Sequence, residues 1–299
     1  MLTLLVSFRG EVAALGAALM WAIASFLFAR LGKFMSPLWL NLSKSSIAIG
    51  FILLTLVLRQ DAIPQLNPTE LGLLALSGIV GIGFGDSMFF ETLFCLGARR
   101  TLLLEAIAPP LSAFLAVLFL QEQLAIGDWL GIVLTIAGVV WVMLERTPEQ
   151  AEKLRLGRGI VAGLLAAFAQ AGGAVLSRSA LASTAVSPLW GTLIRLTAGV
   201  MVLLIWLVWK RQSWRKLQPF CSRQFLVTFT AAAFAGTYLG IWLQQTALKY
   251  TATGIAQALT STSPLFILPI ALLAGERVSL RAILGAVVAL AGIWLLFAN

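Results

Sequence analysis

The segment Ser36-Pro37-Leu38-Trp39 returns as Ser187-Pro188-Leu189-Trp190, and this repetition decides the fold. In each copy a basic residue, Lys44 or Arg195, follows at the same interval inside an apolar run. After a three-residue shift in register the match continues through Pro110 with Pro264, Glu122 with Glu276, Gly131 with Gly285, and Gly138 with Gly292. The chain therefore contains two copies of one unit of about 145 residues, which is the signature of a repeat architecture.

The composition places these repeats in a membrane. Apolar residues make up 60% of the 299 positions, and only 11% are charged. A soluble domain of this length has too little interior to bury so many apolar side chains, so the surplus must face lipid. The net charge of +9 does not indicate nucleic acid, because most Lys and Arg residues lie in short links between apolar runs.

Several classes of site are excluded by what the chain lacks. It contains no His, the commonest general base and metal ligand. Cys95 and Cys221 are solitary and have no zinc-site spacing, so neither a metal nor another cofactor is predicted. The N-terminal apolar run has no signal-peptide cleavage site and belongs to the repeat, so we expect it to be retained.

Ten apolar runs meet the criterion of about 20 residues for a membrane span. They lie near 12–31, 37–58, 71–94, 102–121, 128–145, 159–181, 188–209, 224–247, 254–274 and 281–297. The predicted fold class is an all-α integral membrane protein, with ten transmembrane helices arranged as two inverted five-helix repeats. We expect the repeats at 1–145 and 159–299, joined by a polar central link at 146–158.

The basic residues indicate why the repeats are inverted. Five spans per repeat is an odd number, so the second copy enters the membrane from the opposite side. Accordingly, the basic links are 1–2 and 3–4 in the first repeat, but 7–8 and 9–10 in the second. The positive-inside rule makes this basic face cytoplasmic, together with Cys95 and Cys221, and puts both termini outside.

These landmarks resemble the EamA-type transporters of the drug/metabolite transporter superfamily. The resemblance covers nearly the whole chain and rests on Trp21-Ala22, the two Ser-Pro-Leu-Trp segments, Glu91-Thr92-Leu93, Gln245-Thr246-Ala247-Leu248-Lys249-Tyr250, the prolines of spans 4 and 9, Leu120-Gln121-Glu122-Gln123-Leu124, Ala274-Gly275-Glu276-Arg277-Val278, and the Gly pairs of spans 5 and 10. It implies a multi-pass protein of the cell (inner) membrane, with a central cavity lined mainly by spans 1, 3, 4, 6, 8 and 9, and with spans 5 and 10 packed outside. It also implies cytoplasmic termini, against the charge count.

Prolines at matching places in spans 4 and 9 predict broken helices. They are Pro109, Pro110, Pro264 and Pro269. Each proline removes a backbone donor and displaces the carbonyl of residue i−4, so the helix must bend. Irregular backbone at membrane depth persists only against protein or a wet cavity. We therefore predict a functional bend, with a harmless kink as the alternative.

Three carboxylates, Asp86, Glu91 and Glu105, are candidates for substrate binding or coupling. A charge at the bilayer centre costs about 2.5–3.5 kcal/mol, so each should face a cavity or a partner. Their counterparts in the second repeat are Gly240, Gln245 and Leu259. The acidic chemistry therefore lies on one side of the predicted site, and structural ion pairing with Lys44 or Arg195 is the alternative.

Lys44 and Arg195 are candidates for gating, charge pairing or contact with an anionic group, whereas snorkelling to the headgroups is the alternative. Arg30 and Arg178 lie near span ends and are expected to be interfacial anchors. Neutral cavity candidates are Trp21, Gln170, Tyr238, Gln244, Gln245 and Gln257. Among these, Glu105, Gln257, Trp21 and Gln170 are predicted to line one central pocket.

The sequence thus predicts a secondary transporter, an exporter or exchanger of small metabolites such as amino acids, working by alternating access. Its expected partners are a small-molecule substrate, the lipid bilayer and coupling protons on Glu105 or Glu91, but not nucleic acid, in a monomer or homodimer. A non-transporting membrane regulator or lipid-handling protein is the alternative. No catalytic dyad, metal cluster or phosphate loop supports a membrane enzyme.

Overall fold

The computed structural model describes residues 8–31, 35–143, 156–182, 184–211, 222–266 and 280–298, and these contain helices but no strand. The first repeat contains α2 (Arg9–Leu31), α3 (Pro37–Arg59), α4 (Pro68–Ser77), the π-helix η2 (Gly78–Gly85), α5 (Asp86–Glu105), α6 (Ala108–Leu120) and α7 (Ile126–Met143). The second contains α8 (Leu156–Leu181), α9 (Pro188–Trp209), α10 (Arg223–Ala232), the π-helix η4 (Ala233–Leu239), α11 (Gly240–Tyr250), α12 (Thr253–Thr260) and α14 (Leu280–Ala298).

The repeated Ser-Pro-Leu-Trp segment begins α3 and α9. Ser36 and Ser187 are N-cap residues with extended backbone, and a proline occupies the first turn of each helix. Proline suits this position because its missing N–H would be unpaired there in any case. The Ser187 hydroxyl also accepts a hydrogen bond from the backbone N–H of Trp190 at 3.3 Å. The repetition in the sequence is therefore a repeated helix start.

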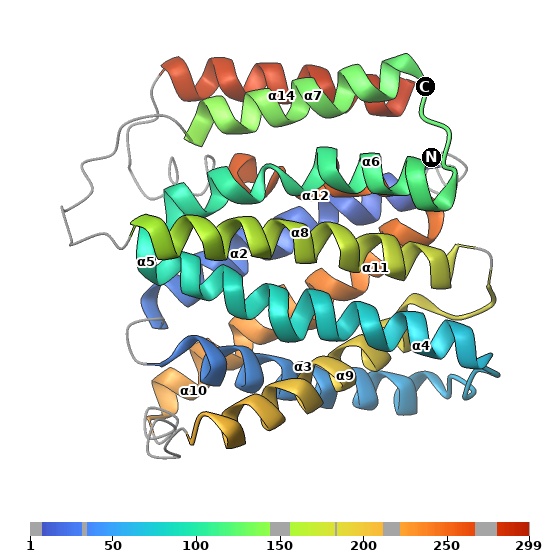
Figure 1. The fold of residues 1–299 in the computed structure, drawn as a ribbon, viewed down its shortest axis with the longest axis vertical. Coiled ribbons are helices and arrows are strands. Elements are labelled where there is room, and N and C mark those ends of the chain that lie inside the picture. The colour runs from blue at the N-terminus through green and yellow to red at the C-terminus, as the bar shows by residue number, and fades with distance from the viewer. Residues whose placement is uncertain are drawn as a thin grey trace.

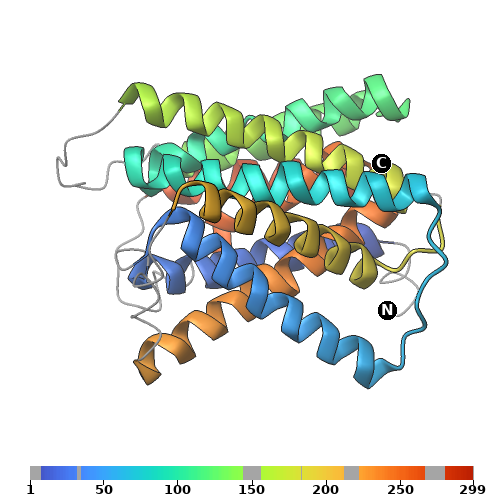
Figure 2. The same ribbon diagram turned by 60° about the horizontal axis from the view of Figure 1, so that its bottom comes forward.

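Equivalent helices of the two repeats run in opposite directions, as the colour gradient shows in both views (Figures 1 and 2). In Figure 1, α2 runs away from the side that carries the marks N and C, and α8 runs towards it. The third span of each repeat packs against the first span of the other repeat: α5 packs along α8, and α11 packs along α2. Likewise η2 contacts α8 and α9, whereas η4 contacts α2 and α3. The two repeats are thus interleaved.

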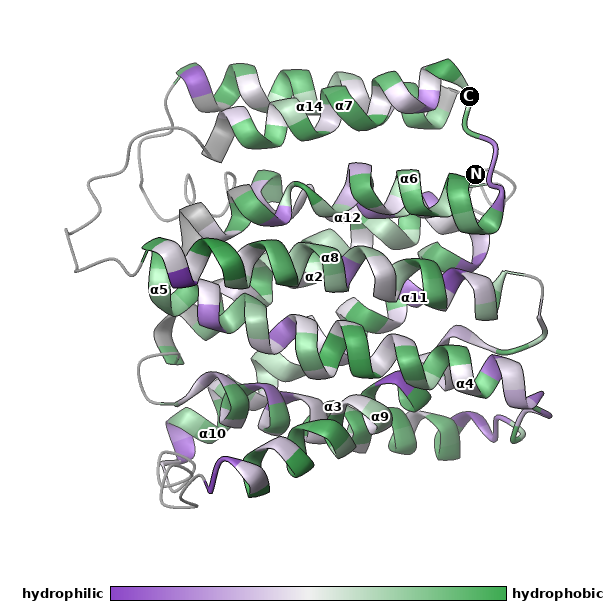
Figure 3. Cartoon of the chain, viewed as in Figure 1, coloured by the Kyte–Doolittle hydropathy of each residue, from purple (hydrophilic) through white to green (hydrophobic). Residues whose placement is uncertain are grey.

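Within the described ranges, five helical runs are long and apolar enough to cross a membrane: Pro37–Arg59, Pro68–Leu96, Leu156–Leu181, Pro188–Trp209 and Arg223–Tyr250. Hydrophobic residues, coloured green, make up much of the length of the helices (Figure 3). Many of them are exposed, including Val57 at 73% and Val208 at 75%. A soluble surface would not carry so many, which identifies an integral multi-pass membrane protein. The count of ten spans stays a prediction.

The predicted end of span 3 at residue 94 agrees within two residues with the apolar run Pro68–Leu96, but the helix itself is longer. The sequence analysis ends span 3 at residue 94, but α5 continues without interruption to Glu105. No proline occurs between Asp86 and Glu105 to stop the helix. The interruption falls instead at Ala106 and Ile107. Pro109 and Pro110 have no N–H groups to bond to the carbonyl groups of Glu105 and Ala106, so the helical hydrogen bonds lapse there. The break therefore lies closer to the predicted carboxylate than the sequence analysis placed it.

The helices α7 and α14 pack along each other through the repeated glycines. A Cβ at Gly138 would overlap the backbone nitrogen of Ala289 and lie 2.6 Å from the carbonyl oxygen of Gly285. A Cβ at Gly292 would lie 2.8 Å from the carbonyl oxygen of Gly131. Small residues are what allow two helix backbones to approach this closely. Spans 5 and 10 therefore pack against each other, a contact that the sequence analysis did not predict.

Gly138→Ala is expected to destabilise this helix pair by about 1–3 kcal/mol, because the added methyl group meets backbone that cannot rotate away. The measurement is the midpoint of thermal unfolding of the purified protein. Gly50→Ala is the matched control, since no atom lies within 4 Å of a Cβ there. An equal effect of both substitutions would contradict the close approach at Gly138.

Candidate substrate-binding site

Both repeats contain a π-helical segment at the same place. η2 interrupts the α4–α5 run, and η4 interrupts the α10–α11 run at the equivalent residues. π-helices are rare and occur mostly as single turns at functional sites. Because a π turn changes the backbone pairing from the fourth to the fifth residue, carbonyl groups in the turn are left for other donors. The repeat thus conserves an irregularity in the middle of its third span.

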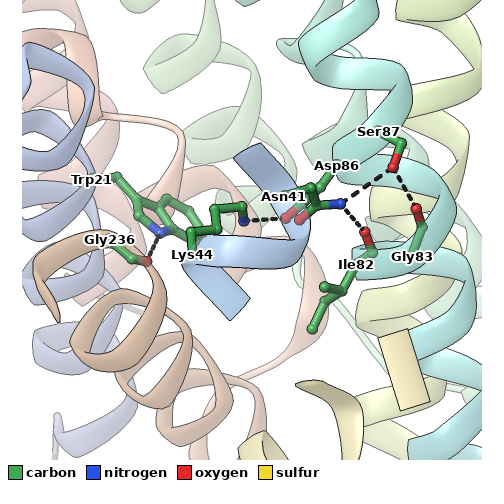
Figure 4. A network of polar contacts seen from close by, with 8 residues as sticks. All are labelled: Trp21, Asn41, Lys44, Ile82, Gly83, Asp86, Ser87 and Gly236. Carbon is green, nitrogen blue, oxygen red and sulfur yellow. Dashed lines mark hydrogen bonds and ion pairs between the residues drawn. The ribbon is translucent and has the colours of Figure 1, made fainter. Parts of the chain in front are cut away.

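Two repeat-equivalent carbonyl groups in these segments accept hydrogen bonds from side chains of other helices (Figure 4). Asn41 on α3 donates from Nδ2 to the carbonyl oxygen of Ile82 at 2.8 Å. Trp21 on α2 donates from Nε1 to the carbonyl oxygen of Gly236 at 2.9 Å. Ser87 adds a bond from its hydroxyl to the carbonyl oxygen of Gly83 at 2.7 Å. These carbonyl groups of the irregular backbone are therefore hydrogen-bonded by polar side chains inside the protein.

Beside η2, Lys44 and Asp86 form an ion pair. Lys44 Nζ lies 2.5 Å from Asp86 Oδ2, and the Lys44 side chain is 8% exposed (Figure 4). This pair is the charge pairing predicted for Lys44, and the burial of the side chain excludes the alternative of snorkelling to the headgroups. For Asp86 it is the alternative of structural ion pairing. Asp86 is thereby engaged by the protein itself.

The predicted breaks in spans 4 and 9 occur at matching residues. In the first repeat the break at Ala106 and Ile107 precedes Pro109 and Pro110. In the second repeat α12 ends at Thr260, before Pro264. Here four consecutive hydroxyl groups bond back to carbonyl oxygens three residues earlier. Pro269 lies outside the described residues.

A cavity of about 620 Å³ lies between these elements. Its lining includes the predicted residues Trp21, Lys44, Asp86, Glu105, Pro109, Gln170, Arg195, Gln244, Gln257 and Pro264. The structure thus brings together Glu105, Gln257, Trp21 and Gln170, which the sequence analysis assigned to one pocket. Ser261 and Ser263, beside the second break, also line it, and most of the remaining wall is apolar. This volume and composition are typical of a small-molecule site.

Two charged groups in the cavity are not engaged by the described part of the protein. No hydrogen bond or ion pair involves the Glu105 carboxylate within the described ranges. Arg195 is 3% exposed, and its Nε and Nη1 have no hydrogen-bond partner there. Because Lys44 and Asp86 neutralise each other, Glu105 and Arg195 are the charges that remain for a ligand.

Four of the predicted site residues that the structure describes do not line this cavity: Pro110, Glu91, Tyr238 and Gln245. Glu91 pairs with Arg158, with 2.7 Å between Oε1 and Nε, at the start of α8. Tyr238 is buried, and its hydroxyl shares a hydrogen bond with that of Thr55 at 2.7 Å. Gln245 is fully buried outside the cavity, although its neighbour Gln244 lines it and donates to Gln257 at 3.3 Å. Successive helical residues point about 100° apart, and on α11 it is Gln244 that faces the cavity.

A separate polar network lies on the side of the protein where the chain ends are marked (Figure 1). Arg178 lies 2.7 Å from Glu122, measured from Nε to Oε1, and its Nη1 donates to the carbonyl oxygens of Leu248 and Lys249 at 2.9 Å. The second Glu122 oxygen accepts from the backbone N–H of Thr253 at 2.8 Å. The prediction that Arg178 is an interfacial anchor is therefore wrong, because its side chain is only 18% exposed and fully engaged.

Sequence reasoning missed Asn41 and the hydroxyl run Thr260–Ser263. A run of four Thr and Ser residues directly before a proline is a signal that could have been used, because hydroxyl groups bond to carbonyl groups that a proline leaves free. Asn41 gave no comparable signal, since its acceptor lies in a helix whose π geometry is not evident from the sequence.

A family model described as the EamA-like transporter family matches residues 8–144 and again residues 157–298. The chain belongs to the EamA-like transporter family. This confirms the resemblance drawn from the sequence, and it makes the protein a membrane transporter of the drug/metabolite transporter superfamily rather than a member of an enzyme family. No curated protein matched the chain. Among solved structures, one crystal structure has a TM-score of 0.78 and 14% identity, and the match covers 96% of each chain. At that identity the likeness shows a shared fold.

Proposed function

We propose that this family member is a secondary transporter that moves small zwitterionic metabolites, such as amino acids, by alternating access. The observation that carries the proposal is the cavity of about 620 Å³ between the two broken helices, with a carboxylate and a guanidinium left for a ligand. Broken helices at the interface of inverted repeats are where secondary transporters place substrate and coupling ions. The repeats at 1–145 and 159–299 would move against each other around this site.

The two ends of the cavity support this proposal. On the side of the chain ends, the network of Arg178 and Glu122 ties α8, α11 and α12 together. Away from that network, the wall of the cavity includes aromatic side chains, such as Phe28 near the end of α2 and Phe94 in α5. In each state of an alternating-access cycle, the binding site must be blocked on one side of the membrane. The network of Arg178 and Glu122 would provide that block in this state.

The test is flux in proteoliposomes loaded with a mixed pool of small metabolites, measured by mass spectrometry with and without a pH gradient. We expect at least one zwitterionic compound to leave faster than from protein-free liposomes, and the gradient to change its rate if protons are coupled. Binding without movement of any compound would instead favour the non-transporting regulator.

A further inference from the structure

We propose that Arg195 is the anion-binding residue of the central cavity, and that the substrate bears a carboxylate which Arg195 holds. This inference rests on the proposed function, because it names the substrate group that the cavity recognises. It distinguishes Arg195 from Lys44, which occupies the equivalent position in the first repeat.

The first observation is the burial of Arg195 without a matching acceptor. The guanidinium lines the cavity at 3% exposure, and neither Nε nor Nη1 finds a hydrogen-bond partner in the described residues. Buried polar groups in proteins are nearly always paired, and each exception calls for an explanation. A buried charge without a partner is strongly destabilising, so one that serves no ligand would be disfavoured. These unpaired donors therefore indicate an anionic ligand.

The second observation is the comparison of the two repeats. Lys44 is satisfied by Asp86 at 2.5 Å, but the counterpart of Asp86 in the second repeat is Gly240. A side chain cannot replace that glycine, because a Cβ there would lie 2.5 Å from Nε1 of Trp21. The indole thus occupies the place where an acid could neutralise Arg195. Asp86 also acts on Arg195 electrostatically, but its Oδ2 atom is held by Lys44.

The charges of the cavity favour a carboxylate over a phosphate. The two basic and two acidic side chains that line it sum to zero: Lys44, Arg195, Asp86 and Glu105. A zwitterion leaves that sum unchanged if its carboxylate meets Arg195 and its ammonium group meets Glu105. A doubly charged phosphate would add repulsion from Asp86 and Glu105 in a setting of low dielectric constant. The planar fork of a guanidinium also matches a carboxylate with two parallel hydrogen bonds.

The test compares the proteinogenic α-amino acids with the amines obtained by removing their carboxyl groups, as two equimolar mixtures in proteoliposomes. In the wild type, at least one amino acid should move about tenfold faster than its matching amine, since a charged hydrogen-bonded contact contributes about 1.5–3 kcal/mol. Arg195→Gln should slow that amino acid about tenfold and leave the amine rates within about twofold, which removes the discrimination. Arg195→Lys should retain part of it.

Lys210→Gln is the matched control, because Lys210 is an exposed basic residue at the end of the same helix, outside the cavity. Thermal unfolding provides a second readout: Arg195→Gln should unfold at the same temperature as the wild type or higher, since it removes an unpaired buried charge. A lower unfolding temperature with equal loss of amino-acid and amine transport would make Arg195 structural and overturn the inference. Unchanged discrimination in Arg195→Gln would overturn it as well, while the transporter proposal would stand. If the wild type moves neither mixture, the proposed function fails and the inference with it.

Discussion

Glu105→Gln is expected to reduce substrate flux about 10- to 100-fold, because a charge-assisted hydrogen bond contributes about 1.5–3 kcal/mol and each 1.4 kcal/mol is a factor of ten. Gln keeps the size and polarity of the side chain but removes its charge and its exchangeable proton. The measurement is substrate-driven and pH-driven flux in proteoliposomes across a pH series. Expression and thermal stability should stay nearly unchanged, because no described protein group depends on this carboxylate.

The position of Glu105 at the end of α5 supports this expectation. Pro109 has no N–H to donate to the carbonyl oxygen of Glu105, so a free backbone acceptor and an ionisable side chain lie together at the break. Such a pair suits a substrate ammonium group or a coupling proton. In a chain without His, a carboxylate is the available proton carrier.

Glu70→Gln provides the control, since Glu70 lies in the capping box at the start of α4 and does not line the cavity. Its flux should match the wild type. Wild-type rates for Glu105→Gln at every pH would remove Glu105 from coupling. Asp86 would then be the next carboxylate to test, because Glu91 is held by Arg158 outside the cavity.

The helix starts and helix breaks could be predicted from the sequence, because each depends on residues within one helical turn. Ser36 and Ser187 indicate helix starts, because an N-cap serine and the proline after it stabilise the first turn of a helix. Pro109 and Pro264 indicate breaks, because a proline disrupts the helical hydrogen bond four residues earlier. Once the breaks and the repeat are known, a polar residue one turn before the proline of a break, such as Glu105 before Pro109, is expected to face the cavity.

The remaining features depend on partners far apart in the chain. The sequence gives no reason to pair Asn41 with Ile82, because the freed carbonyl exists only in the π geometry. It also does not decide between Gln244 and Gln245, since a few tens of degrees of helix rotation exchange them. The burial of Arg178 requires three helix ends and one loop to meet, and a residue near a span end otherwise predicts snorkelling.

Arg178→Met is expected to lower the free energy of unfolding by about 3–5 kcal/mol, the usual cost of removing one partner from a buried ion pair. The reason is geometric. Glu122 would keep its two contacts with Thr253, but its charge would be left without a cation, and the carbonyl oxygens of Leu248 and Lys249 would lose a donor. The measurement is thermal or denaturant unfolding of the purified protein.

The contrast with a similar pair elsewhere makes this prediction specific. Arg158 and Glu91 are also 2.7 Å apart, but the Arg158 side chain is 62% exposed, compared with 18% for Arg178. Water and salt screen the exposed pair, so Arg158→Met should cost less than about 1 kcal/mol. Adding Glu122→Gln to Arg178→Met should recover part of the loss, because it removes the uncompensated charge. Equal effects of Arg158→Met and Arg178→Met would mean that the network does not hold this side closed. A large effect of Arg178→Met that Glu122→Gln fails to relieve would instead assign the stability to the bonds from Arg178 to Leu248 and Lys249.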